Sequence, residues 1–121
     1  MSQLYYYQLS NIRVVDGDTI DADIDLGFNV STRQRIRLCR INAPETRLQS
    51  KIKNLEERIQ EKNLGLRSKS YLSKLCKDNK VFLHSVGSGK YGRVLGELYT
   101  EDQKSINDLM LSKGHARPYE G

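Results

Sequence analysis

The segment DGDTIDADIDLG, residues 16–27, predicts a hairpin turn that opens into a half-buried strand. Asp16-Gly17 is a turn signal, because both residue types tolerate a positive φ angle. From Thr19 onward, apolar side chains fall on alternate positions: Ile20, Ala22, Ile24 and Leu26. The positions between them hold aspartates: Asp21, Asp23 and Asp25. This period of two is typical of a strand that buries one face and exposes the other, and Gly27 ends it.

The elements around this strand complete the pattern of a small barrel. Predicted strands cover residues 11–15 (with a start near Tyr5), 19–26, 30–41, 81–85 and 93–99. Predicted helices cover residues 64–77 and a last segment that Ser105 caps and Gly114 ends. Three strands, a helix, two strands and a helix is the order of a five-stranded OB-type Greek-key barrel. We therefore predict an α+β, mainly β, fold with two or three helices and a single domain, residues 1–121.

Residues 47–63 leave two interpretations open. The segment is highly charged, and Ile52, Leu55 and Ile59 lie at helical spacing within it, so an exposed helical arm and a mobile loop both fit. The helix predicted after it has a clearer apolar stripe, which we expect to be buried. The members of this stripe are Leu64, Tyr71, Leu72, Leu75 and Cys76.

The charge balance indicates a polyanionic partner. The chain has 121 residues, a formal net charge of +5 and a pI of about 9.3, and a basic domain attracts nucleic acid. Aspartates crowd residues 16–25, and arginines follow at alternate positions of the next predicted strand. A cation bound beside a phosphate site would explain such an acidic cluster in a basic protein.

Targeting signals are not visible in the sequence. Residues 1–10 lack the basic and apolar regions of a signal peptide, and no apolar run is long enough to cross a bilayer. These observations predict a cytoplasmic protein that does not contact a membrane. We also expect a monomer and a bacterial or phage source.

Three short motifs carry candidate chemistry. In Asp16-Gly17-Asp18-Thr19 the tight turn places Asp18 at the mouth of a strand, where a carboxylate suits Ca²⁺ or Mg²⁺. In the stretch RLCRINAPET, residues 37–46, a proline stiffens the backbone before Glu45, which suits a base or a water-holding group. The alternatives are ordinary ones: the first motif simply makes a turn, and the second is a strand end with a solvated glutamate.

The third motif is Lys90-Tyr91-Gly92-Arg93. Its arginine can form a two-pronged contact with a phosphate while the tyrosine ring stacks on a base. The alternative is a basic hairpin tip without a ligand. In order and spacing, the three motifs together resemble the staphylococcal (micrococcal, thermonuclease) nuclease family, and the ending GHARPY, residues 114–119, is similar to the final segment of that family.

This resemblance implies an OB-type barrel and calcium-dependent hydrolysis of phosphodiester bonds in DNA, RNA or both, with little sequence specificity. The implied catalytic residues are Arg37, Glu45 and Arg93. The implied metal ligands are Asp18, Asn42 and the backbone carbonyl of Ala43, with Asp16 as a further candidate. The implied substrate contacts are Lys90, Tyr91 and Tyr119.

Asn42 departs from the family pattern, which has aspartate there. Its amide oxygen can coordinate calcium but brings no negative charge, so the resemblance implies a weaker metal site or one assisted by Asp16. Strand parity also places Arg37 and Asn42 on opposite faces, so a bend or bulge before Pro44 must bring them together. A catalytically weak or inactive OB-fold module that only binds nucleic acid is the alternative function, and a protein-interaction scaffold has no positive signal.

Overall fold

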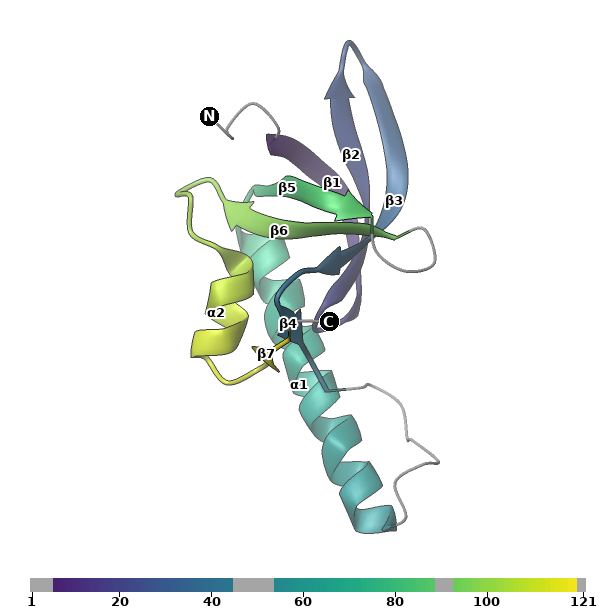
Figure 1. Cartoon of the computed structure of the whole chain (residues 1–121), viewed down its shortest axis with the longest axis vertical. Helices are drawn as coiled ribbons and strands as arrows, with labels where there is room; N and C mark the ends of the chain where they lie inside the picture. The colour runs from purple at the N-terminus through teal and green to yellow at the C-terminus, as the bar shows by residue number, and fades with distance from the viewer. Residues whose placement is uncertain (1–5, 45–53, 89–92, 120–121) are drawn as a thin grey trace.

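The computed structural model describes residues 6–44, 54–88 and 93–119, and within them five strands close into a barrel. The elements, in chain order, are β1 (Tyr6–Asp16), β2 (Thr19–Gly27), β3 (Val30–Leu38), β4 (Ile41–Asn42), α1 (Leu55–Asp78), β5 (Val81–Ser88), β6 (Val94–Thr100), α2 (Ile106–Ser112) and β7 (Arg117–Pro118). The barrel order is β1-β2-β3-β6-β5, and β5 returns to pair with β1 (Figure 1). Strands β3 and β6 run parallel, while the other barrel pairs are antiparallel. This confirms the predicted OB-type α+β fold.

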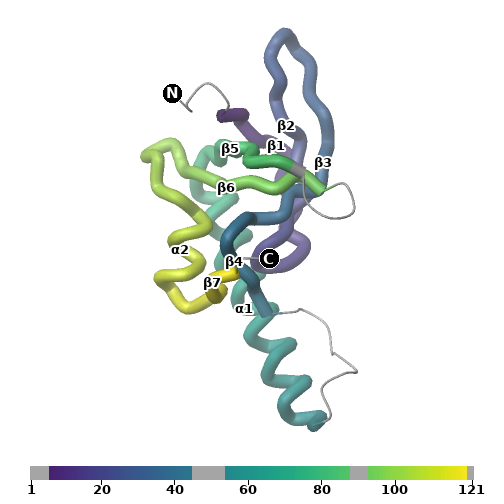
Figure 2. Tube along the Cα trace, in the orientation of Figure 1, coloured from purple at the N-terminus to yellow at the C-terminus, as the bar shows by residue number. Residues whose placement is uncertain are grey.

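The apolar face of β2 faces the barrel core as predicted, except at its far end. Ile20 and Ala22 are fully buried and Ile24 nearly so, but Leu26 is 48% exposed. The last pair between β1 and β2 is Leu9 with Ile24, so β2 and β3 continue beyond it as a two-stranded ribbon. Figure 2 shows this ribbon extending past the rest of the barrel. The prediction for Leu26 was wrong because, among the strands of the described residues, β3 alone pairs with this part of β2.

The outward aspartates of β2 are partnered by arginines of β3. Asp21 Oδ1 accepts from Arg35 Nε at 2.8 Å, and Asp23 Oδ1 accepts from Arg33 Nη1 at 3.0 Å. The hydrogen bond from Arg35 is the main reason that the pKa of Asp21 is lowered. These cross-strand pairs give Asp21 and Asp23 partners on β3.

Helix α1 begins inside the segment for which a helical arm and a mobile loop were both open. Asn54 caps it, since its side chain accepts from Glu56 N at 2.8 Å. Leu64 was expected in the buried stripe but is 48% exposed. The buried positions of α1 are Gly65, Ser68 and Leu72. Two of these are small residues, which let the helix lie close to the barrel and which a search for apolar side chains overlooks.

Helix α2 packs against β6 and is anchored by a buried polar side chain. Ser105 Oγ accepts from Asp108 N at 3.1 Å, which confirms the predicted cap. Asn107 is fully buried; its Oδ1 accepts from Leu98 N at 3.1 Å and its Nδ2 donates to the carbonyl oxygen of Cys39 at 2.7 Å. Asn107 therefore links α2 to β6 and to the chain that follows β3.

Neither α1 nor α2, the two helices of the described residues, is both long and apolar enough to cross a membrane.

Candidate active site

A bend between β3 and β4 brings Arg37 and Asn42 to the same side of the chain, although regular strand alternation would place them on opposite faces. Arg40 has φ +67°, a left-handed conformation that non-glycine residues adopt at a cost, and Cys39 N donates to Gly96 O at 2.9 Å. The guanidinium of Arg40 contacts Glu97 Oε2 at 2.6 Å and Asp108 Oδ1 at 2.9 Å, which holds the bend against β6 and α2. After the bend, Arg37 Nη2 lies 3.4 Å from Asn42 Oδ1. The predicted bend is therefore present before Pro44.

The turn between β1 and β2 carries Asp18 into the same region. Gly17 was expected to supply a positive φ, but within residues 6–44 the positive φ angles occur elsewhere. A Cβ atom at Gly17 would lie 2.6 Å from Ser68 Cβ and 2.8 Å from Ala43 Cβ. The glycine is needed because the turn is packed between α1 and the chain after β4, and not because of its backbone conformation.

The carboxylate of Asp18 accepts hydrogen bonds from two separate segments of the chain. Its side chain is nearly buried; Oδ1 accepts from Thr19 Oγ1 at 2.9 Å and Oδ2 accepts from Ala43 N at 2.9 Å. The carbonyl oxygen of Asp18 also accepts from Leu38 N at 2.8 Å. The carboxylate is thus fixed to strands β2 and β3 and to the segment after β4. Sequence reasoning did not assign Thr19 a role, although its place beside Asp18 was the available signal.

Arg37 extends its guanidinium toward the oxygens of this cluster. Nη2 lies 3.6 Å from Asp18 Oδ2, and Nη1 donates to the carbonyl oxygen of Leu38 at 2.6 Å. The side chain is 14% exposed, and its guanidinium carbon lies 5.5 Å from the ring centroid of Tyr119. Tyr119 is placed there because β7 pairs with β4 and Tyr119 N donates to Arg40 O at 2.8 Å.

The structure brings together five of the residues that the sequence analysis singled out: Asp18, Arg37, Asn42, Ala43 and Tyr119. Arg93 immediately precedes β6, whose Leu95 pairs with Arg37, so it lies at the same end of the barrel. Asp16 pairs with Thr19 across the turn. Glu45, Lys90 and Tyr91 lie outside the described residues.

The oxygen atoms at this site suit a hard cation. Asp18 supplies a carboxylate and Asn42 an amide oxygen, both within 3.6 Å of Arg37 Nη2. Calcium and magnesium bind such oxygen ligands, and backbone carbonyls can complete their shell. Within residues 6–44, 54–88 and 93–119, no three His, Cys, Asp or Glu side chains gather as a metal cluster. A cation here would therefore meet one carboxylate and neutral oxygens from the described part of the chain.

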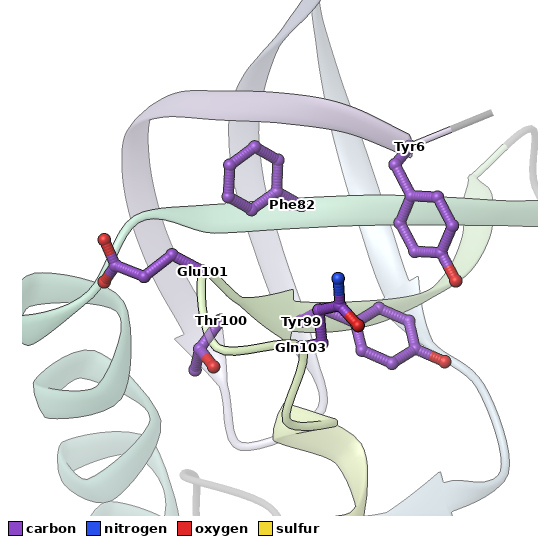
Figure 3. A pocket seen from close by; sticks show the side chains of 6 residues that line it. All are labelled: Tyr6, Phe82, Tyr99, Thr100, Glu101 and Gln103. Atoms are coloured by element: carbon purple, nitrogen blue, oxygen red, sulfur yellow. The ribbon is translucent and has the colours of Figure 1, made fainter. Parts of the chain in front are cut away.

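A separate concave surface lies away from this cluster. It has a volume of about 390 Å³ and is lined by Tyr6, Phe82, Tyr99, Thr100, Glu101 and Gln103 (Figure 3). These residues belong to the start of β1 and β5, to the far end of β6 and to the turn that follows it, whereas Arg37 pairs near the beginning of β6. The site of Asp18 and Arg37 is distinguished by its charged groups, not by the size of its cavity.

Comparison with known proteins agrees with the fold. The family described as staphylococcal nuclease homologue matches residues 35–121. An uncharacterized endonuclease of Escherichia coli is 29% identical over 109 residues, which cover 90% of this chain and 59% of that protein. Endonuclease YhcR of Bacillus subtilis (strain 168) is 32% identical over 110 residues, which cover 88% of this chain and 8% of that protein. The chain therefore spans about three-fifths of the length of the first relative and a small part of the second.

Proposed function

Because this chain belongs to the staphylococcal nuclease homologue family, we propose that it is a metal-dependent nuclease that hydrolyses phosphodiester bonds of DNA, RNA or both. One observation carries the proposal: side-chain oxygen atoms of Asp18 and Asn42 both lie close to the same guanidinium nitrogen, Nη2 of Arg37. A module that only holds nucleic acid needs positive charge but no nearly buried carboxylate beside its arginine. The names of the relatives, both called endonucleases, support the same conclusion.

Arg37 and Arg93 are proposed to bind the scissile phosphate. A guanidinium is permanently charged and matches two phosphate oxygens at once, so it stabilises the charge that develops during phosphoryl transfer. Contacts with Asp18, Asn42 and the Leu38 carbonyl pre-orient Arg37 before substrate binds. The ring of Tyr119 covers one side of this guanidinium, and Lys90 and Tyr91 are proposed to contact the substrate nearby.

Asp18, Asn42 and the carbonyl of Ala43 are proposed to hold one Ca²⁺, with Asp16 as a further candidate. When bound, such an ion neutralises phosphate charge as a Lewis acid and helps to orient the attacking water. Asp18 is well placed for this role, because its hydrogen bonds with Thr19 and Ala43 keep the carboxylate in one position. Glu45 is proposed to hold or deprotonate the water.

A nuclease assay with and without a chelator tests this function. We expect the chain to degrade plasmid and single-stranded DNA with added calcium, and chelation to stop the reaction. Glu45→Gln should lower the rate about a hundredfold or more, as expected for loss of a general base. If no condition with any divalent metal yields cleavage, the active-nuclease proposal fails.

The alternative is a binding module without catalytic activity. Asn42 favours it, because an amide in place of a carboxylate lowers the negative charge available to a cation. Salt-sensitive binding of single-stranded DNA without cleavage would select this alternative.

Asn42→Asp is expected to tighten calcium binding about tenfold, because a second carboxylate adds charge to the ligand set. Isothermal titration calorimetry with CaCl₂ measures the change. Asn63→Asp adds the same charge on an exposed side chain of α1 and serves as the matched control. Equal or weaker affinity in Asn42→Asp would refute the ligand role of Asn42.

A further inference from the structure

The N-terminal half of α1 presents an apolar stripe that does not face the barrel. We call this surface the arm stripe. Its residues are Leu55, Ile59, Lys62 and Leu66, of which three are apolar and Lys62 is charged. Leu55 is 58% exposed, Ile59 44% and Leu66 42%. Figure 1 shows this half of the helix extending past the barrel, so the stripe stands clear of the strands.

The arm stripe has the spacing of a helix-pairing seam. Its positions are separated by four, three and four residues, which is the alternation of d and a positions in a heptad. At 100° per residue, the stripe lies about 120° around the helix from the row Gly65, Ser68 and Leu72 that packs on the barrel. One face of α1 therefore serves the fold, and a second apolar face is left without a partner in the described structure.

We propose that the arm stripe binds the arm stripe of a second copy of this chain, with the two helices antiparallel. In antiparallel pairs, a positions of one helix meet d positions of the other. Leu55 would then face Leu66 of the second copy, and Ile59 would face Lys62 of the second copy. A single two-fold axis that passes between residues 60 and 61 of the two helices produces both contacts. The arm stripe of one copy is therefore complementary to the same stripe of the second copy.

The charges along the arm favour the antiparallel direction. Lys62 occupies a d position of the arm stripe, and it is the charged member of that stripe. In a parallel pair d positions meet d positions, so Lys62 would face Lys62 of the second copy, whereas the antiparallel pair places each Lys62 against Ile59. The opposed helix dipoles add to this preference.

The interface should be weak, because it contains about three helical turns from each copy. Lys62 weakens it further, since its methylene stem can cover Ile59 of the second copy but its charge must reach water. We expect association with a Kd in the range of about 10 to 500 µM. This departs from the monomer expected from the sequence, and it is independent of the nuclease proposal.

Sedimentation equilibrium between about 5 and 500 µM tests the proposal. We expect the average mass to rise from monomer toward dimer, Ile59→Asp to abolish the rise, and Lys62→Leu to tighten the dimer about tenfold or more. Leu64→Asp is the matched control: it puts the same charge on an exposed leucine on the opposite side of the same helix, and the dimer should persist. Circular dichroism checks that each variant keeps its helix.

The antiparallel orientation of the two helices is tested by mixing Leu55→Cys protein with Leu66→Cys protein under mild oxidation. Mass spectrometry should find disulfides that join the introduced cysteines at positions 55 and 66, and only a minor share that joins position 55 to position 55. Dominant 55–55 disulfides would refute the antiparallel arrangement. A monomeric mass for both the parent and Lys62→Leu throughout the range, or a dimer unaffected by Ile59→Asp, would overturn the interface itself.

Discussion

Arg37→Ala is expected to cleave DNA about a thousandfold more slowly than the parent, because phosphate-binding arginines contribute about three to five powers of ten to phosphoryl transfer. Arg37 Nη2 lies 3.6 Å from Asp18 Oδ2 and 3.4 Å from Asn42 Oδ1, and its side chain is largely buried beside them. Alanine would remove both the positive charge and the two-pronged contact with the phosphate. Initial rates on plasmid DNA at saturating calcium measure the effect.

Two further variants separate the charge of Arg37 from its geometry and its position. Arg37→Lys keeps the charge but loses the planar fork, so an intermediate loss of about tenfold or more is expected. Arg35→Ala changes the same residue type two positions earlier on β3, where it contacts Asp21, and should leave the rate within about twofold of the parent. A rate for Arg37→Ala that matches Arg35→Ala would remove Arg37 from the phosphate site.

Gly17→Ala is expected to lower the free energy of unfolding by about 3 kcal/mol, since overpacking of a close contact costs about 1 to 3 kcal/mol and more where backbone must shift. The new methyl group would meet Ser68 on α1 and Ala43 after β4, and neither contact is the end of a flexible side chain. Urea denaturation measures the loss. The same shift displaces Asp18, so the cleavage rate should fall as well.

Gly27→Ala is the matched control for Gly17→Ala. Gly27 has φ +86° and open space around its missing Cβ, so alanine there meets conformational strain without a steric clash. The expected cost is about 1 kcal/mol. If Gly17→Ala costs no more than Gly27→Ala, the close packing of the turn between α1 and Ala43 is not what requires glycine at position 17.

Local patterns predicted much of the fold and the members of the site. The alternation from Ile20 to Ile24 defined the inward face of β2, and Ser105 marked the start of α2, because both depend on neighbours within one element. The same approach failed at Leu26 and Leu64. Their patterns are locally correct, but burial requires a second surface, and within the described part of the chain each of these side chains stays 48% exposed.

The sequence by itself determined the barrel, through alternation, turn residues and caps, and its resemblance to the nuclease family singled out Asp18, Arg37, Asn42 and Ala43. Tertiary structure alone decided how these groups meet: the left-handed Arg40 turns the chain after β3, Gly17 fits between α1 and Ala43, and the outer aspartates pair with arginines of the next strand. The physical reason is the distance along the sequence over which each kind of interaction acts. Propensity and periodicity act within a few residues, whereas an ion pair or a close contact depends on which distant segments the barrel brings side by side.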